Sequence, residues 1–151
     1  NCNLVNVIDQ NYDYGLSVYC TSKISLQKFK IYNFHLGSLQ TQRGSFIFFY
    51  KFFKNWENIY LTFHEIGEKF DVGKILNERK ILLDEKCSAT DIIFSYLKNM
   101  DFLNESIKLV GTDVKKEYLN YEKLHLVPSF ATLFIKILFY YFKRSRKFFS
   151  N

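Results

Sequence analysis

Proline and glycine are scarce in this chain of 151 residues, which has one proline and six glycines. So few backbone breakers exclude a collagen-like chain and a low-complexity linker. Hydrophobic residues make up 48% of the sequence and aromatic residues 19%, which is enough apolar surface for a packed core and argues against disorder. We therefore predict a globular domain in which each glycine marks a specific turn.

Cysteine is also rare, and its three copies, Cys2, Cys20 and Cys87, lie far apart in the sequence. An odd number with no close pair suits neither a disulfide framework nor a zinc motif, and it favours a reduced, cytoplasmic protein. We find no signal peptide at the start of the chain. The first residue is Asn1 rather than methionine, so we expect the sequence to be a piece of a longer chain.

Acidic residues are fewer than basic ones, 15 against 21, so the net charge is +6. A moderate positive excess suits an anionic small molecule, such as a phosphorylated substrate, as well as a nucleic acid. Much of this charge lies near the C-terminus, at Lys143, Arg144, Arg146 and Lys147. The excess is therefore no clear sign that the rest of the chain binds nucleic acid.

Short apolar runs predict strands in the first third of the chain. A buried strand is predicted over residues 14–19, a weaker one over 4–8 and a further short strand over 30–34. After them, Ser45 can cap a helix that runs to Phe53.

The middle of the chain alternates in polarity and then becomes helical. Strands are predicted over residues 57–66 and 74–83, with a turn at 70–73 between them. Ser88 begins a single long helix, which Gly111 ends. Its apolar stripe consists of Ile92, Ile93, Tyr96, Leu97, Met100, Leu103, Ile107 and Val110.

The C-terminal part has a different character. Residues 118–127 are predicted to be extended, and an amphipathic helix is predicted to follow Pro128. The apolar run over 126–142 contains Lys136 and is shorter than the roughly 20 residues of a membrane span. We predict a packed or interfacial helix that ends in the basic cluster.

Two motifs carry most of the chemical information. The first, NFHLGSLQTQRG, follows a predicted strand, places Asn33 and His35 two residues apart and ends at Gly44. The second, LTFHEIGEKFDVGKIL, spans residues 61–76 and places Asp71 before a glycine. The order strand, N-x-H, loop, helix, strand, D-x-G, strand, long helix resembles that of the folate-dependent formyltransferases, which use 10-formyltetrahydrofolate. The resemblance covers about residues 14–110, the second half of the family's catalytic domain, and the family's first half is absent.

The resemblance implies a fold and an activity. The fold would be α/β, with a Rossmann-like formyltransferase-type sheet over residues 1–111 and a C-terminal extension over 112–151 that ends in an aromatic, basic helix. The activity would be transfer of a formyl group from 10-formyltetrahydrofolate to the amino group of a small molecule, without a metal. The glycine two residues after the histidine is similar to the sugar branch of the family and favours a nucleotide-linked amino sugar over glycinamide ribotide or initiator methionyl-tRNA.

The resemblance also assigns residues. It implies catalytic roles for Asn33, His35 and Asp71, and a role in holding the loop or meeting a phosphate for Arg43 and Gly44. The folate-binding residues that it implies are Cys20, Lys23, Ile24, Ile66, Gly67, Phe70 and Gly73.

The chemistry of these side chains suits the reaction independently. Attack of an amine on a formamide carbon creates an oxyanion, which hydrogen-bond donors stabilise. Asn33 and a protonated His35 are such donors, and residues i and i+2 of a strand face the same side, so both can aim at one atom. Asp71 can accept the proton of the amine through water or hold His35 in its charged form. We also expect Gly67 and Gly73 to let the backbone approach a flat pteridine ring closely.

Alternatives stay open. An isolated N-x-H motif, a D-x-G turn and a loop arginine are each often structural, and we expect His64 to be a packing residue. A truncated or degenerate formyltransferase fold could act as a non-catalytic binding module through its basic tail. An unrelated α/β domain with a chance match is a third interpretation. A homodimer and contact of the tail helix with a membrane surface are also left open.

Overall fold

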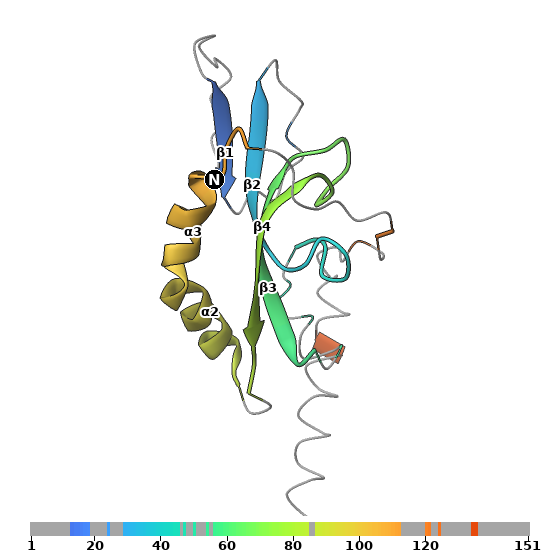
Figure 1. Cartoon of the computed structure of the whole chain (residues 1–151). Helices are drawn as coiled ribbons and strands as arrows, with labels where there is room; N and C mark the ends of the chain where they lie inside the picture. Colours follow the sequence, from blue (N-terminus) through green and yellow to red (C-terminus); the bar gives the residue numbers. More distant parts are fainter. Residues whose placement is uncertain are drawn as a thin grey trace, which may run out of the picture.

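The computed structural model describes residues 13–18, 24, 29–45, 47, 50, 54, 56–84, 87–112, 120, 121, 124, 134 and 135. Within them lies a sheet in the order β1-β2-β3-β4. Its strands are β1 (Tyr14–Val18), β2 (Lys30–Leu36), β3 (Asn58–Glu65) and β4 (Ile75–Leu82). β1 runs parallel to β2, and the other neighbours are antiparallel. The helices α2 (Ala89–Lys98) and α3 (Met100–Ile107) follow β4 and lie on one side of the sheet (Figure 1).

The predicted α/β fold is confirmed. Each of the strands predicted over 14–19, 30–34, 57–66 and 74–83 is present, and β2 continues beyond its predicted end to Leu36. Ser88 caps α2 as predicted. The predicted strand over 4–8, most of the helix over 45–53, and nearly all of the extension over 112–151, including the basic helix, fall outside the described residues.

The sheet has one apolar face. Tyr32 and Phe34 of β2 and Leu61 and Phe63 of β3 pack with Phe102 of α3 into the core. The rings of Phe34 and Phe63 stack with 4.5 Å between centroids, and Phe102 meets Phe34 edge-on at 6.4 Å. Because side chains alternate along a strand, the residues between them point to the opposite face. On β2 and β3 these are Asn33, His35, Thr62 and His64.

The prediction of a single helix from Ser88 to Gly111 is wrong, because Asn99 divides it into α2 and α3. The side-chain amide of Asn99 donates to the carbonyl of Ser95 at 2.7 Å, and its oxygen accepts from Arg79 at 3.0 Å. Its backbone, at φ −103° and ψ 28°, leaves the helical region. A side chain that bonds the local backbone competes with the helix for hydrogen bonds, which explains the break.

The break also changes which residues are buried. Phe102, which the predicted stripe omits, is 2% exposed, whereas Leu97 and Met100 are 56% and 52% exposed. The turn at Asn99 shifts the helical phase, so that α3 presents Phe102 and Ser106 to the sheet.

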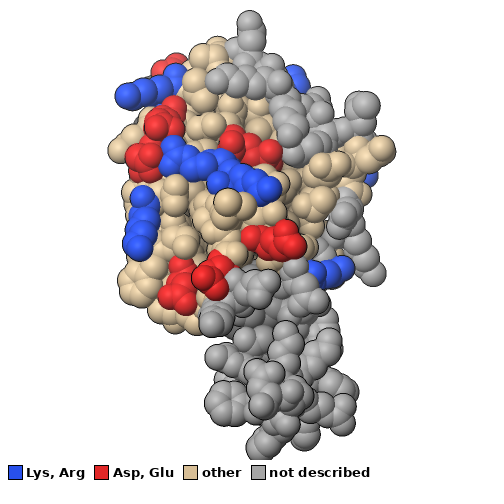
Figure 2. All heavy atoms as spheres, turned by 60° about the horizontal axis from the view of Figure 1, so that its bottom comes forward, with Lys and Arg blue, Asp and Glu red and all other residues tan. Residues whose placement is uncertain are grey.

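On the face viewed in Figure 2, Lys and Arg side chains lie next to Asp and Glu side chains, so positive and negative charges alternate over this surface. No broad patch of one sign covers the described part of that face. Among the described residues, no helix combines the length and the apolar character that crossing a membrane requires.

Tyr96 of α2 buries its hydroxyl group, which has no hydrogen-bond partner among the described residues. Burial raises the pKa of this phenol. Since an unpaired buried hydroxyl costs about 1–3 kcal/mol, we expect Tyr96→Phe to raise the free energy of unfolding by about 1 kcal/mol in urea denaturation. The matched control is Ser106→Ala, which removes a buried hydroxyl that donates to Phe102 at 2.6 Å and should lower stability. A Tyr96→Phe protein that is less stable than the wild type would show that the Tyr96 hydroxyl forms a stabilising hydrogen bond.

Candidate active site

Polar side chains of neighbouring strands form a row on the sheet face opposite the helices. Ser17 of β1 is the register partner of Asn33, and Asn33 is that of His64. Two residues further along β2, His35 is the register partner of Thr62 on β3. Ser17, His35, Thr62 and His64 are buried. A buried polar row of this kind requires hydrogen-bond partners, which come largely from the two loops over this face.

His35 contacts an acceptor with each ring nitrogen. Its Nε2 lies 2.7 Å from the carbonyl oxygen of Gln42, and its Nδ1 lies 3.4 Å from Oδ1 of Asp71. A carbonyl and a carboxylate can only accept, so a ring protonated on both nitrogens suits this geometry. The structure thus brings His35 and Asp71 together. We expected Asn33 and His35 to aim at one atom. The structure differs, because both ring nitrogens of His35 already face protein atoms.

Asp71 is held on three sides. Its φ of 47° is left-handed, a conformation that Asp adopts more readily than most residues. Its Oδ2 accepts the backbone N–H of Gly44 at 2.6 Å. Arg43 donates from Nε to the Asp71 carbonyl at 3.0 Å and from Nη2 to the Phe70 carbonyl at 2.7 Å. Arg43 and Gly44 therefore tie the loop after β3 to the loop after β2.

The loop after β2, residues 37–44, is fixed by its own bonds. The N–H of Gln42 donates to the carbonyl of Ser38 at 2.8 Å, and the Gln42 side chain donates to Asn58 at 2.9 Å. The Thr62 hydroxyl donates to the Gly37 carbonyl at 2.7 Å. These bonds place the Gln42 carbonyl that holds the ring of His35.

The loop after β3 closes like the end of a hairpin. Glu65 donates to Lys74 at 2.8 Å, and Gly67 donates to Val72 at 3.0 Å. A Cβ on Gly73, whose φ is 137°, would lie 1.9 Å from the Glu65 carbonyl oxygen, and one on Gly67 would lie 3.1 Å from Val72. We expected these glycines to let a ligand approach. In the structure the close approaches are made by the chain itself.

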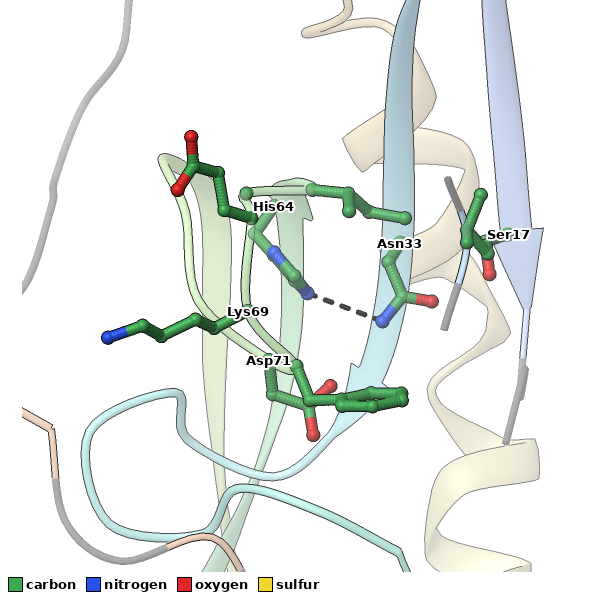
Figure 3. Close-up of a pocket in the computed structure, with 10 residues that line it drawn as sticks. Ser17, Asn33, His64, Lys69 and Asp71 are labelled. Carbon is green, nitrogen blue, oxygen red and sulfur yellow. Dashed lines mark hydrogen bonds between the residues drawn. The ribbon is translucent and has the colours of Figure 1, made fainter. Parts of the chain in front are cut away.

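A pocket of about 40 Å³ opens between the sheet and the loop after β3 (Figure 3). Two predicted catalytic residues, Asn33 and Asp71, line it, whereas His35 does not. The lining also includes four of the predicted folate-binding residues, Ile24, Ile66, Gly67 and Phe70. Gly73 is not part of the lining, and Cys20 and Lys23 fall outside the described residues.

The size of the pocket limits what it can hold. A cavity that holds a single water has a volume of roughly 10–15 Å³. The pocket therefore suits a group as small as a formyl rather than a whole folate. Within the described part of the chain, no three His, Cys, Asp or Glu side chains gather that could hold a metal ion.

His64 is buried, as expected of a packing residue, and both of its ring nitrogens also lie within hydrogen-bond distance of a partner. Its Nε2 lies 3.3 Å from Nδ2 of Asn33, and its Nδ1 lies 3.1 Å from the Glu65 carbonyl (Figure 3). Burial, helped by the nearby His35, lowers the pKa of His64 to about 4, although the backbone carbonyls of Glu65 and Val72 and the carboxylate of Asp71 favour the charged form. The ring is therefore neutral at pH 7.

Four residues of the lining were not predicted from the sequence, namely Ser17, His64, Glu68 and Lys69. Ser17 and His64 could have been found as the register partners of Asn33 on the two adjacent strands. Glu68 and Lys69 lie on the loop that leads to Asp71, and nothing in their spacing distinguishes them from solvated loop charges.

Solved structures share this fold. A 4-N formyltransferase from Francisella tularensis is 16% identical and superposes with a TM-score of 0.68 over 78% of this chain and 51% of its own. The fold is that of the N-formyltransferases. A sugar N-formyltransferase from a Shewanella species is 22% identical, with a TM-score of 0.60 over 77% of this chain and 48% of its own. An N-formyltransferase from Helicobacter canadensis, solved with folinic acid and dTDP-3-aminofucose, is 19% identical, with a TM-score of 0.63 over 74% of this chain and 44% of its own.

The chain spans about half the length of these N-formyltransferases. No protein-family model matches the sequence, and no curated protein matches it significantly. The resemblance to the formyltransferase fold that the two motifs indicated is confirmed by the structures.

Proposed function

We propose that the protein takes part in the transfer of a formyl group from 10-formyltetrahydrofolate to an amino group, and that the acceptor is a nucleotide-linked amino sugar. The observation that carries this proposal is the placement of Asn33 and Asp71 on one small pocket, with His35 paired to Asp71, in an N-formyltransferase fold. The Helicobacter canadensis structure, with its folinic acid and amino-sugar nucleotide, supports both substrate classes.

The geometry supports a division of roles among the three residues. The amine attacks the formyl carbon, and the carbonyl oxygen becomes an oxyanion. The Nδ2 of Asn33 donates one hydrogen to His64 and has a second hydrogen for this oxyanion. Asp71 faces the pocket and accepts the proton that the amine loses, directly or through water. Before this proton transfer, His35 lies beside the charged carboxylate of Asp71 and balances its charge. When the oxyanion collapses, the bond between the formyl carbon and the folate nitrogen breaks, and the proton held by Asp71 passes to that nitrogen, so that tetrahydrofolate leaves.

The pocket fits the reacting formyl group. The division of the chain into a domain over residues 1–111 and an extension over 112–151, the folate contacts of Cys20 and Lys23, and a cytoplasmic location remain predictions. The activity itself is a proposal, because this chain spans about half the length of the solved N-formyltransferases.

The test is incubation of the protein with 10-formyltetrahydrofolate and a panel of nucleotide-linked amino sugars, followed by mass spectrometry. We expect tetrahydrofolate and one N-formylated sugar in equal amounts. Replacement of the oxyanion donor in Asn33→Ala should lower the rate of transfer by about 10²–10³-fold. Its matched control is Asn77→Ala, because Asn77 is a strand asparagine that bonds Ser106 of α3, and this variant should transfer formyl as the wild type does. No product with any acceptor, together with no binding of folinic acid in calorimetry, would overturn the proposal.

A further inference from the structure

The buried His64 and the half-buried Asn33 form a pair across two antiparallel strands. They are register partners on β3 and β2, and His64 is 1% exposed. The Nδ1 of His64 faces the Glu65 carbonyl, which can only accept, so Nδ1 carries the ring proton. In the neutral ring Nε2 then has a lone pair and must accept from Asn33.

This tautomer allows one orientation of the Asn33 amide. The Nδ2 group faces His64, and Oδ1 points the other way, toward Ser17 (Figure 3). Turning the amide by 180° would place Oδ1 against the lone pair of Nε2, and two acceptors repel each other.

On its other side Asn33 has Ser17, its neighbour on β1. The buried Oδ1 of Asn33 and the buried Oγ of Ser17 have no hydrogen-bond partner among the described residues. A hydroxyl can donate as well as accept, so Ser17 suits either orientation of the amide and selects neither. The contact with His64 is therefore the one that fixes the orientation of Asn33.

We propose that His64 is a positioning residue, which acts by accepting a hydrogen bond from Asn33 and so directs the second N–H of Asn33 to the pocket where the oxyanion forms. The inference depends on the proposed formyl transfer. It gives His64 a role through Asn33 and no contact with the reacting atoms.

Two substitutions separate this role from simple packing. In His64→Gln the longer side chain places an amide oxygen near the position of Nε2, where it can accept from Asn33. In His64→Asn the shorter amide reaches only the position of Nδ1. We expect His64→Asn to lower kcat by about 10–100-fold with little change in KM for the folate, because misplacement of a catalytic group by about 1 Å has effects of that size. His64→Gln should recover most of the wild-type kcat.

The outcomes distinguish this inference from the proposed function. A wild type with no transfer refutes the function, whereas an active wild type that His64→Asn matches in kcat refutes the positioning role. Equal losses in both variants also refute it, since packing alone would then explain the effect. If neither variant folds, nitrogen NMR of the wild-type protein still decides: we expect Nε2 of His64 to be unprotonated at pH 7 and coupled to Nδ2 of Asn33, and a protonated Nε2 would overturn the proposal.

Discussion

Replacement of Asp71 by asparagine is expected to slow formyl transfer by about 10²–10⁴-fold, the usual contribution of a positioned acid or base. Asparagine has the shape of aspartate, tolerates the left-handed backbone of this position and can still accept the N–H of Gly44. It cannot take up a proton from the amine, and it removes the negative charge beside His35. The change therefore removes the chemistry and keeps most of the structure.

The matched control is Asp101→Asn on α3. Asp101 is exposed and bonds Arg79 at 2.9 Å, on the helix side of the sheet. Its replacement should leave the rate of transfer unchanged. The measurement is kcat/KM for both variants, with circular dichroism and a thermal melt to confirm that each is folded. A folded Asp71→Asn protein with nearly wild-type kcat/KM would show that Asp71 is not the base.

The strands could be predicted because their signal is local. Alternation of side chains in β3 and β4 predicts their extent to within one or two residues. The helix break could not be predicted from periodicity, because the apolar pattern continues across Asn99. What stops the helix is a side chain that bonds Ser95 and Arg79, and the Arg79 contact depends on the packing of α3 against β4.

The candidate site was predictable in part for the same reason. The two motifs contain Asn33 and Asp71, which are 38 residues apart in the sequence. Both line one pocket, because β2 and β3 are neighbours in the sheet. The partners of Asn33 are set by strand register, which the sequence does not state. Ser17 and His64 therefore emerge only once the strands are aligned. The orientation of His35 toward Gln42 likewise depends on how the loop over residues 37–44 folds back.

The buried polar row also determines how the protein responds to acid. His64 is 1% exposed, and burial lowers its pKa to about 4. In the unfolded chain the pKa of a histidine is about 6.5. Between these two values the unfolded state binds a proton that the folded state does not, so the free energy of unfolding falls as the pH falls. The stability that this group contributes is complete above about pH 6.5 and is lost as the pH drops through about 4.

We therefore expect His64 to lower the free energy of unfolding by about 3 kcal/mol between pH 7 and pH 4, since each pH unit of difference corresponds to about 1.4 kcal/mol. Other groups titrate in the same pH range, so the effect of His64 must be measured as the difference in the free energy of unfolding between the wild type and a variant without this histidine. Urea denaturation of the wild type and of His64→Gln at a series of pH values supplies it, because glutamine does not titrate and has a similar size. The wild-type curve should fall more steeply than that of the variant, and the gap should open below pH 6.5. Parallel curves would mean that His64 is not buried as a neutral ring, and the fixed orientation of Asn33 would then lose its physical basis.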